Sequence, residues 1–447
     1  MKQTDRFPEA SGQNGWFETS RYKNHQFNSV DEIERSYDYV VVGAGFGGVN
    51  AAFRLAENKP DATVALFDAM PVGYFSSGRN AGFIIDVPHS IVGDPNFTLD
   101  DQKWRFRLNR YVIDRMVKIK EENNLQIDWQ QAGMQQAGMH QTAREKGSLK
   151  YLNMLAKFLD VMGAQYQWFD KDEVAKRLGT DFYFKALYTP GTILINPSET
   201  VRGLATVLPK NVYVFENCPV LEVLEGEVPQ VKLTNGKIIS CKQVIMTVNA
   251  FIKNFGAKGS ENLIGIHSFG AHTRELTDEE IATLHGAKPW GLCSAHPAGA
   301  TLRYTTTKRL YVRTDITFAT HINIPPERLY KSIYKLRRAF NNRFPQLSNV
   351  NFEYVYGGFI PLSRNTLPFF ANVGKNVYAG AAGDGTGVTR ASMCGTFLAD
   401  WVCGRDSEEL RYMQQCDAPS YCPPEPFRTV GATARLVWED LHARSEI

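Results

Sequence analysis

Six consecutive residues, Gly43 to Gly48, constrain the fold of this chain more than any other segment. Their sequence, GAGFGG, fits the pattern G-x-G-x-x-G. In that pattern the glycines allow a tight turn, a close approach of backbone to a pyrophosphate and close packing of a helix on a sheet. The apolar run 37–42 predicts a buried parallel strand before the turn, and residues 46–57 predict a helix after it. Because amides at the start of such a helix bind phosphates, the segment predicts a dinucleotide-binding βαβ unit.

An acidic residue completes this unit. A second β-branched run, 63–67, predicts the next strand, and Asp68 follows it 20 residues beyond Gly48. A carboxylate at this position accepts hydrogen bonds from ribose hydroxyls, and its charge disfavours a 2′-phosphate. The motif alone does not distinguish FAD from NAD, so both remain open at this point.

The chain has 447 residues, a length that is enough for two domains. The pattern of apolar and charged residues changes several times along it. The expected class is α/β (α+β overall), with a nucleotide-binding domain interrupted by a substrate domain. Residues 1–35 are polar and predict an arm or lid on the surface, and residues 406–447 form a C-terminal tail. The discontinuous nucleotide-binding domain is expected at 36–93, 195–260 and 366–405, and the substrate domain at 94–194 and 261–365.

Further elements follow from periodicity and turn residues. Helices are expected near 98–124, 145–162 and 325–343, and one is expected to end near residue 403. Strands are expected at 211–215, 229–233, 237–248, 301–306, 309–315 and 376–382.

Charge and cysteine content exclude several classes of protein. The net charge is only +3 and no run of five like charges occurs, so we expect no nucleic-acid partner. The seven cysteines lack CxxC or metal-type spacing, which predicts reduced thiols, a cytoplasmic location and no metal site. The N-terminal residues lack the apolar segment of a signal peptide, and no apolar stretch is long enough to span a membrane.

Two other glycine-rich segments carry a family resemblance. Residues 73–83, GYFSSGRNAGF, resemble the G-x-x-S-G-R-N-G-G stretch of the D-amino-acid-oxidase-like FAD-dependent oxidoreductases, with Ala81 in place of a glycine. Residues 383–390, GDGTGVTR, resemble the second flavin loop of that family, with Thr386 where a histidine is common. Weaker similarities lie at 244–250, 356–358 and 364–368. The resemblance covers roughly residues 36–405 and is closest to the γ-glutamylputrescine oxidase branch.

This resemblance implies a Rossmann-like FAD-binding domain of the glutathione-reductase type with an inserted antiparallel-sheet substrate domain. Some relatives attach FAD covalently, but residues 351–359 contain no cysteine and His89 is the one histidine near the first flavin loop. We therefore expect non-covalent FAD. The positions expected to contact it are Gly43, Ala44, Gly45, Phe46, Gly47, Gly48, Asp68, Ala69, Ser77, Gly78, Arg79, Asn80, Ala81, Val220, Asn249, Gly383, Gly385, Thr386, Gly387 and Val388.

The resemblance also implies an enzyme that oxidises a CH–NH bond of an amine or amino acid. The expected step is hydride transfer to flavin N5 followed by hydrolysis of the imine, so the protein positions and desolvates the substrate. Relatives with carboxylate substrates grip them with an arginine. The substrate-site candidates here are Arg303, Tyr304, Arg313, Tyr356 and Arg364.

Two alternatives remain open. The chain could oxidise the C–O bond of a 2-hydroxy acid or a polyol phosphate, although no tight basic cluster stands out in the sequence. It could also be a flavin-bearing accessory subunit with little turnover, docking a partner through Trp16, Phe17 and residues 416–424. The sequence leaves the exact substrate, the electron acceptor and the oligomeric state open.

Overall fold

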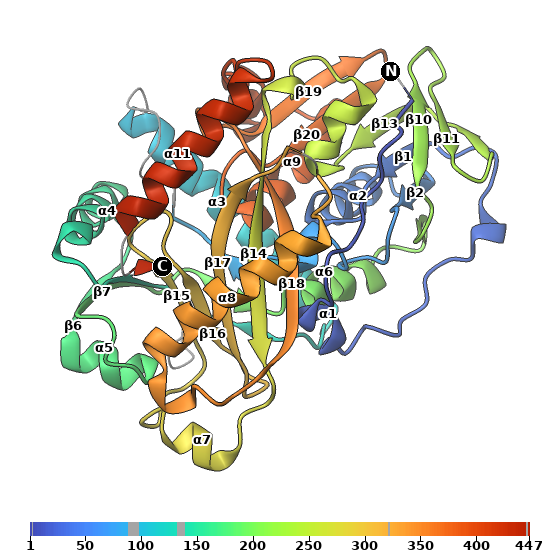
Figure 1. The fold of residues 1–447 in the computed structure, drawn as a ribbon. Coiled ribbons are helices and arrows are strands. Elements are labelled where there is room, and N and C mark those ends of the chain that lie inside the picture. The colour runs from blue at the N-terminus through green and yellow to red at the C-terminus, as the bar shows by residue number, and fades with distance from the viewer. Residues whose placement is uncertain (2, 88–97, 132–138, 321, 444–445) are drawn as a thin grey trace.

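Two large sheets lie next to each other in the computed structural model of the chain (Figure 1). The structure describes all residues except 2, 88–97, 132–138, 321 and 444–445. The six-stranded sheet has the order β19-β20-β13-β1-β2-β9, in which only β19 runs antiparallel to its neighbour. Its strands are β1 (Tyr39–Val42), β2 (Val64–Phe67), β9 (Val212–Phe215), β13 (Gln243–Met246), β19 (Phe369–Gly374) and β20 (Val377–Ala381).

Both faces of this sheet are covered, which explains why its strands are continuous apolar runs. On one face Val41 and Leu66 pack against α2 (Phe46–Asn58) and α9 (Gly387–Val402). On the other face Val40 and Phe67 pack against a small sheet of β10 (Val220–Leu224), β11 (Gln230–Leu233) and β12 (Ile238–Ser240). The β1–α2 turn therefore lies at the carboxyl edge of a buried parallel sheet.

The eight-stranded sheet is antiparallel at every pairing except β15 with β5. In sheet order its strands are β18 (Phe352–Leu362), β14 (Ile264–Thr273), β17 (Leu310–Phe318), β16 (Thr301–Tyr304), β15 (Trp290–Ser294), β5 (Met139–Ala143), β7 (Lys185–Thr189) and β6 (Gln167–Asp170). Helices α8 (Pro326–Arg343) and α11 (Phe427–Ala443) cross its outer face (Figure 1).

The other described elements fill the space around the two sheets. A small sheet of β3 (Phe83–Ile84), β8 (Ile193–Ile195) and β4 (Trp129–Gln130) begins where the glycine-rich segment 73–83 ends. The remaining α-helices are α1 (Gly15–Glu18), α3 (Leu99–Glu122), α4 (Leu149–Met162), α5 (Lys171–Leu178), α6 (Pro197–Thr206), α7 (Asp278–Ala282) and α10 (Glu408–Gln415).

The expected strand at 237–248 is wrong in one respect, because it is two strands in different sheets. The chain leaves the small sheet after β12 and enters the parallel sheet at β13. The backbone amide of Lys242, between the two strands, donates to the carbonyl of Asp38. A continuous strand could not serve both sheets, since they pack face to face.

Helix α3 shares its core with the parallel sheet, although it was expected to belong to the substrate domain. Ile113, Met116 and Ile119 pack in the same apolar cluster as α2 and α9. The proposed domain boundary at residue 94 stays a prediction, and the packing of α3 favours a boundary after this helix.

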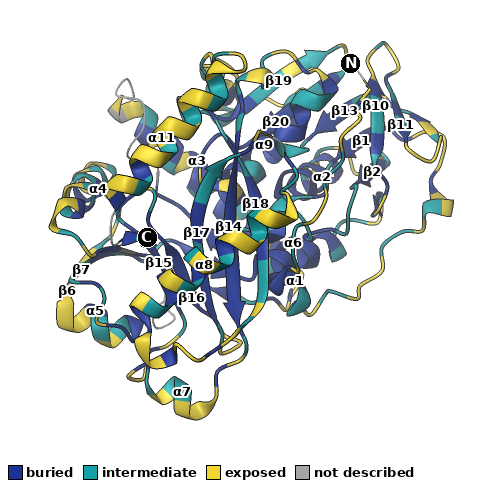
Figure 2. Cartoon of the chain, in the orientation of Figure 1, coloured by how far each residue is buried: buried dark blue, intermediate teal, exposed yellow. Residues whose placement is uncertain are grey.

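The N-terminal arm crosses from the small sheet to the large one. The amide of Thr4 donates to the carbonyl of Leu221 in β10, and the amide of Gly357 in β18 donates to the carbonyl of Ser11. Farther along, Trp16 is 2% exposed and packs with Tyr311 and Tyr356. The arm is thus attached to both sheets, and its aromatic segment lies in the interior (Figure 2), so the expectation that Trp16 and Phe17 lie on the surface and dock a partner is wrong.

Among the described residues, no helix combines the length and the apolar character that crossing a membrane requires.

The β1–α2 turn gives a prediction about stability. A Cβ on Gly48 would lie 1.7 Å from the carbonyl oxygen of Gly43, so alanine cannot fit without moving the turn. We expect Gly48→Ala to lower the free energy of unfolding by about 3 kcal/mol, measured by denaturant titration of the cofactor-free protein. Gly147→Ala is the control, because a Cβ there meets nothing within 4 Å. Equal stability of the two variants would contradict this packing argument.

Candidate functional site

A cavity of about 210 Å³ opens at the carboxyl edge of the parallel sheet. Its floor is the β1–α2 turn, one wall is the 73–80 loop, and the other is the turn before α9. Thirteen of the expected cofactor positions line it: Gly43, Gly45, Phe46, Gly47, Asp68, Ala69, Ser77, Asn80, Val220, Asn249, Gly385, Gly387 and Val388. Segments that are far apart in the sequence therefore meet at one site.

The start of α2 is suited to a phosphate. Gly43 adopts a φ of +97°, which only glycine adopts readily, and it turns the chain from β1 towards the helix. The N-cap is Gly45, so the first turn has no side-chain cap. The amide of Phe46 donates to Ser77 Oγ over 3.2 Å. Because the N-cap glycine has no side chain of its own, a ligand can accept from the other amides of this turn, which carry the positive end of the helix dipole.

Asp68 holds the β1–α2 turn by accepting backbone amides on both of its carboxylate oxygens. One carboxylate oxygen accepts the amide of Ala44 at 2.7 Å and the other accepts the amide of Met70 at 2.9 Å. Burial nevertheless raises the pKa of Asp68 from 3.8 to about 6. The residue lies on the cavity wall beside Ala69 and Val220, where ribose hydroxyls could donate to it. Ala44 and Gly48 shape the turn without lining the cavity.

The first flavin loop is held by its own polar side chains. Asn80 donates from Nδ2 to the carbonyl of Ser77 at 2.7 Å and accepts the amide of Gly82 at 2.8 Å. A Cβ on Gly78 would lie 1.8 Å from the carbonyl oxygen of Gly73, so this glycine serves the loop's own packing. Ser77 and Asn80 face the cavity, whereas Gly78 supports them from behind.

Arg79 uses its donors to bind protein backbone. Its Nε donates to the carbonyl of Tyr74, Nη1 donates to those of Ser11 and Gly357, and Nη2 donates to that of Gly12. The side chain is 5% exposed, and burial lowers the pKa of Arg79. This arginine therefore joins the flavin loop to the N-terminal arm and to β18.

The turn before α9 is fixed by a buried acid. Asp384 Oδ1 accepts both the amide and the hydroxyl of Thr386, at 2.9 and 2.6 Å, and Oδ2 accepts Arg390 Nε at 3.1 Å. Although burial opposes ionisation, the charges of Arg390 and Arg105 hold the pKa of Asp384 below its ordinary value. Thr386 thus positions the loop and does not line the cavity.

Two glycines of this turn leave room for a ligand. A Cβ on Gly385 or Gly387 would meet no protein atom within 4 Å, and neither residue has a positive φ. Gly383, by contrast, faces the carbonyl oxygen of Leu367, which a Cβ would approach to 1.8 Å. Glycine at 385 and 387 is therefore not required by the protein's own packing, as expected where a planar cofactor approaches the backbone. The residues present fit FAD.

A second cavity, of about 90 Å³, shares a wall with the first. The residues lining both are Ser76, Asn80, Phe359, Ile360, Gly385, Gly387 and Val388. Beyond this wall lie Arg313, Thr301 and Ser268 from three strands of the large sheet. A molecule in the second cavity would therefore contact a cofactor in the first.

Arg313 supplies positive charge to the second cavity. Its Nη2 donates to Thr301 Oγ1 at 2.7 Å, and no carboxylate of the described residues forms an ion pair with it. The hydroxyl of Ser268 is buried and has no hydrogen-bond partner in the described part of the chain. Both groups are therefore available to a polar ligand.

The other four substrate-site candidates do not line this cavity. Arg303 is fully buried and donates from Nη1 to the carbonyls of Ala81, Gly82 and Ile195. Tyr304 and Tyr356 belong to apolar clusters, and Arg364 is exposed. Of the five candidates, the structure brings Arg313 alone to the cavity wall.

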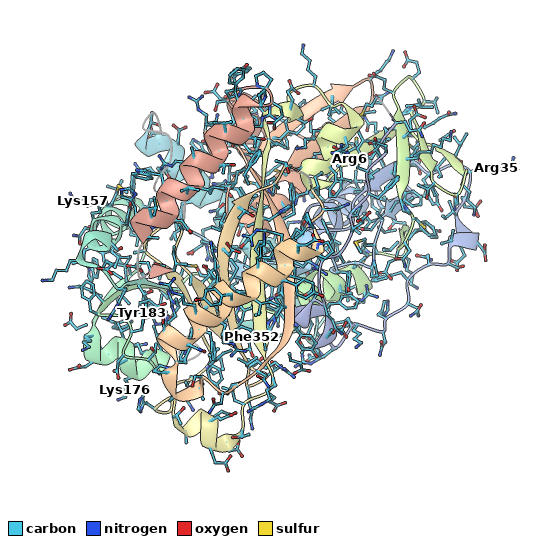
Figure 3. The ribbon with its side chains drawn as sticks, viewed as in Figure 1. Arg6, Arg35, Lys157, Lys176, Tyr183 and Phe352 are labelled. Atoms are coloured by element: carbon cyan, nitrogen blue, oxygen red, sulfur yellow. The ribbon has the colours of Figure 1, made fainter. Side chains whose placement is uncertain are left out.

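Sequence reasoning missed two sets of lining residues. Thr4, Arg6, Phe7 and Pro8 of the arm close one side of the first cavity; Figure 3 labels Arg6. Phe359, Ile360 and Pro361 of β18 form the wall near the second cavity. The arm carries no motif, and its position depends on contacts far away in the sequence.

His89, the candidate for covalent attachment of FAD, lies outside the described residues.

The open glycines give a second prediction. We expect Gly387→Ala to leave the thermal midpoint of the cofactor-free protein unchanged, because the new methyl group meets only the cavity. The same change should raise the Kd for FAD by about tenfold or more, ~1.4 kcal/mol, in a fluorescence titration. Gly147→Ala should alter neither quantity. A lowered thermal midpoint with unchanged FAD affinity would contradict the assignment.

Asp68 gives a prediction about pH. Its pKa in the folded protein is raised from 3.8 to about 6. The protonated carboxyl therefore adds to the free energy of unfolding below pH 3.8, and this contribution is lost as the pH rises through 6. Ribose hydroxyls bind the ionised form better, so FAD affinity should increase up to about pH 6 and then level off. Asp68→Asn should bind FAD more weakly at pH 8 and lack this dependence. Parallel pH profiles of the two proteins would exclude Asp68 as the group responsible.

Comparisons with known proteins agree with this geometry. The family model described as "FAD dependent oxidoreductase" (DAO) matches residues 38–401. "Probable oxidoreductase OrdL" of Haemophilus influenzae is 25% identical over 420 residues, which cover 90% of each chain. "Gamma-glutamylputrescine oxidoreductase" of Escherichia coli is 24% identical over 449 residues, covering 96% of each chain.

A solved structure supports the same assignment at the level of fold. Glycine oxidase from Geobacillus kaustophilus superposes with a TM-score of 0.68 at 16% identity, covering 84% of this chain and 96% of its own. This likeness confirms the predicted fold class. The family match covers more than half of the chain and confirms the resemblance inferred from the glycine-rich loops. The chain belongs to the DAO family of FAD-dependent oxidoreductases.

Proposed function

We propose that this enzyme oxidises the CH–NH bond of a small amine that carries a carboxylate, such as an amino acid or an N-alkyl amino acid. The observation that carries the proposal is Arg313, a cation without a carboxylate partner among the described residues, in the cavity that shares a wall with the cofactor site. A guanidinium binds a carboxylate through two parallel hydrogen bonds, which fixes both the position and the orientation of the substrate.

The remaining lining groups suit this reaction. Thr301 Oγ1 accepts from Arg313 Nη2 and holds the guanidinium towards the cavity, and Ser268 Oγ offers a further polar contact. Phe83, Ile85 and Phe359 contribute an apolar lining that excludes water and disfavours a charged ammonium group. The amine is therefore bound neutral, with its nitrogen lone pair available. Bound FAD supplies a two-electron acceptor for the hydride leaving the adjacent carbon.

The relatives support the same substrate class. Gamma-glutamylputrescine and glycine, which appear in the names of two of them, both carry a carboxylate and an amine. A 2-hydroxy acid would present the same carboxylate to Arg313, so C–O oxidation is the second candidate. A polyol phosphate is disfavoured, because the other arginine beside the second cavity, Arg79, donates to backbone carbonyls.

Flavin bleaching under anaerobic conditions tests the proposal. We expect the yellow holoenzyme to be bleached by one class of amino acids and not by the corresponding hydroxy acids. Bleaching by hydroxy acids alone would establish C–O oxidation. Colour that neither class bleaches would favour the accessory-subunit alternative.

Replacing Arg313, with Arg364 as the control, tests the role of this arginine in substrate binding. We expect Arg313→Ala to lower kcat/KM by about 100-fold or more, ~2.7 kcal/mol, mainly through KM, because the substrate carboxylate loses its partner. The exposed Arg364 is the control, and Arg364→Ala should leave the kinetics unchanged. Similar kinetics for the two variants would overturn the role given to Arg313, while FAD content reports separately on the cofactor site.

We also propose that FAD is bound without a covalent bond and that the enzyme works in a reducing compartment. All seven cysteines are unpaired, and five of them are buried, which suits a cytoplasmic enzyme. Acid precipitation should release the yellow colour to the supernatant. Flavin retained in the pellet would establish a covalent bond and overturn this part of the proposal.

A further inference from the structure

Helix α11 presents an apolar stripe to solvent. Phe427, Val430, Val437 and Leu441 are 71%, 67%, 53% and 71% exposed, and Ala434 completes the stripe. The five residues are separated by three, four, three and four positions, the spacing of the a and d positions in a helix-pairing seam. They therefore lie on one side of the helix over its whole length (Figure 2).

The side of α11 that faces the protein is less apolar than its outer side. Ala443 and Glu439 are the buried residues of the helix, and Ala432, Leu436 and Asp440 are half-buried. A surface helix ordinarily turns its apolar stripe towards the core and its polar face to water. This helix has the opposite arrangement, which indicates that its outer face is made for a contact.

The helix is firmly attached to the rest of the protein. At its start Arg428 Nε donates to the carbonyl of Pro423 at 2.9 Å, and near its end Asp440 pairs with Lys335 of α8 at 3.4 Å. Beyond the helix, the carbonyl of Glu446 accepts Arg343 Nη2 at 2.7 Å, and its carboxylate accepts the amide of Arg144 at 2.9 Å. The stripe is thus a fixed part of the surface, beside α8 on the outer face of the large sheet (Figure 1).

The charges around the stripe select its occupant. The positions that flank a seam of this register are Gly431, Thr433, Trp438 and Asp440, and the one charge among them is paired with Lys335. Arg435, which is exposed next to Ala434, pairs with Glu439. A second copy of the helix, antiparallel about Ala434, places its Asp440 opposite Arg428, so the charges of the two copies are complementary.

The spacing is also self-complementary. In an antiparallel pairing centred on Ala434, Phe427 of each copy lies opposite Leu441 of the other, and Val430 lies opposite the exposed Trp438. Gly431 and Ala434 place small side chains near the centre, where two helix axes come closest. A two-fold contact requires such a patch, because each copy offers the same surface to the other.

We propose that α11 forms a two-fold interface with α11 of a second copy of this chain, through the seam Phe427, Val430, Ala434, Val437 and Leu441. The interface lies on the outer face of the large sheet and leaves both cavities free.

The mass of the holoenzyme in solution tests this inference. At about 10 μM the wild type should elute as a dimer, and the double variant Val430→Glu/Val437→Glu should be a monomer with unchanged FAD content. Val228→Glu, at a 63% exposed valine between β10 and β11, is the control and should remain dimeric. A monomeric wild type, or a double variant that stays dimeric, would overturn the interface.

A cross-link gives an independent readout. Ala434→Cys should form a covalent dimer under mild oxidation, whereas the wild type, with its seven native cysteines, should not. Absence of the cross-link in a dimeric protein would exclude the antiparallel register. Wild-type binding to phosphatidylglycerol vesicles that is lost in the double variant would assign the stripe to a membrane surface and overturn the proposal.

Discussion

The buried guanidinium of Arg79 is the contact on which the cofactor site depends. Its nitrogens donate to four carbonyls, which belong to the flavin loop, two positions of the N-terminal arm and strand β18. A cation without such partners is expensive to bury, so its four acceptors make the position tolerable. The loop that carries Ser77 and Asn80 keeps its shape because this one side chain holds three separate segments around it.

Arg303 is a second buried arginine that donates to this loop, through Nη1 alone, while its Nε and Nη2 have no hydrogen-bond partner among the described residues. It is fully buried, donates to three carbonyls and lies over the rings of Trp16 and Phe83. Within the described residues neither Arg79 nor Arg303 has a carboxylate partner in an ion pair. The loop therefore carries a positive potential that water does not screen, beside the cavity that fits an anionic dinucleotide.

The glycine-rich turns were predictable because their function is local. A tight turn or a close backbone approach requires glycine at fixed spacing, so Gly43, Gly45 and Gly48 identify the fold from the sequence. The substrate site was not predictable in the same way. Arg303 and Arg313 lie on neighbouring strands with similar local sequences, and only the packing of whole sheets buries one and leaves the other on a cavity wall.

The attachment of the arm has a consequence for the lifetime of the cofactor complex. Residues 4–8 close one side of the cavity, while Thr4 is bonded to Leu221, and Phe7 and Glu9 are bonded to the side chain of Asn323. On that side of the cavity a dinucleotide meets these bonds before it reaches solvent. An arm held in this way slows the exchange of bound flavin in addition to the contacts that the phosphates make, because its bonds must break for that side to open.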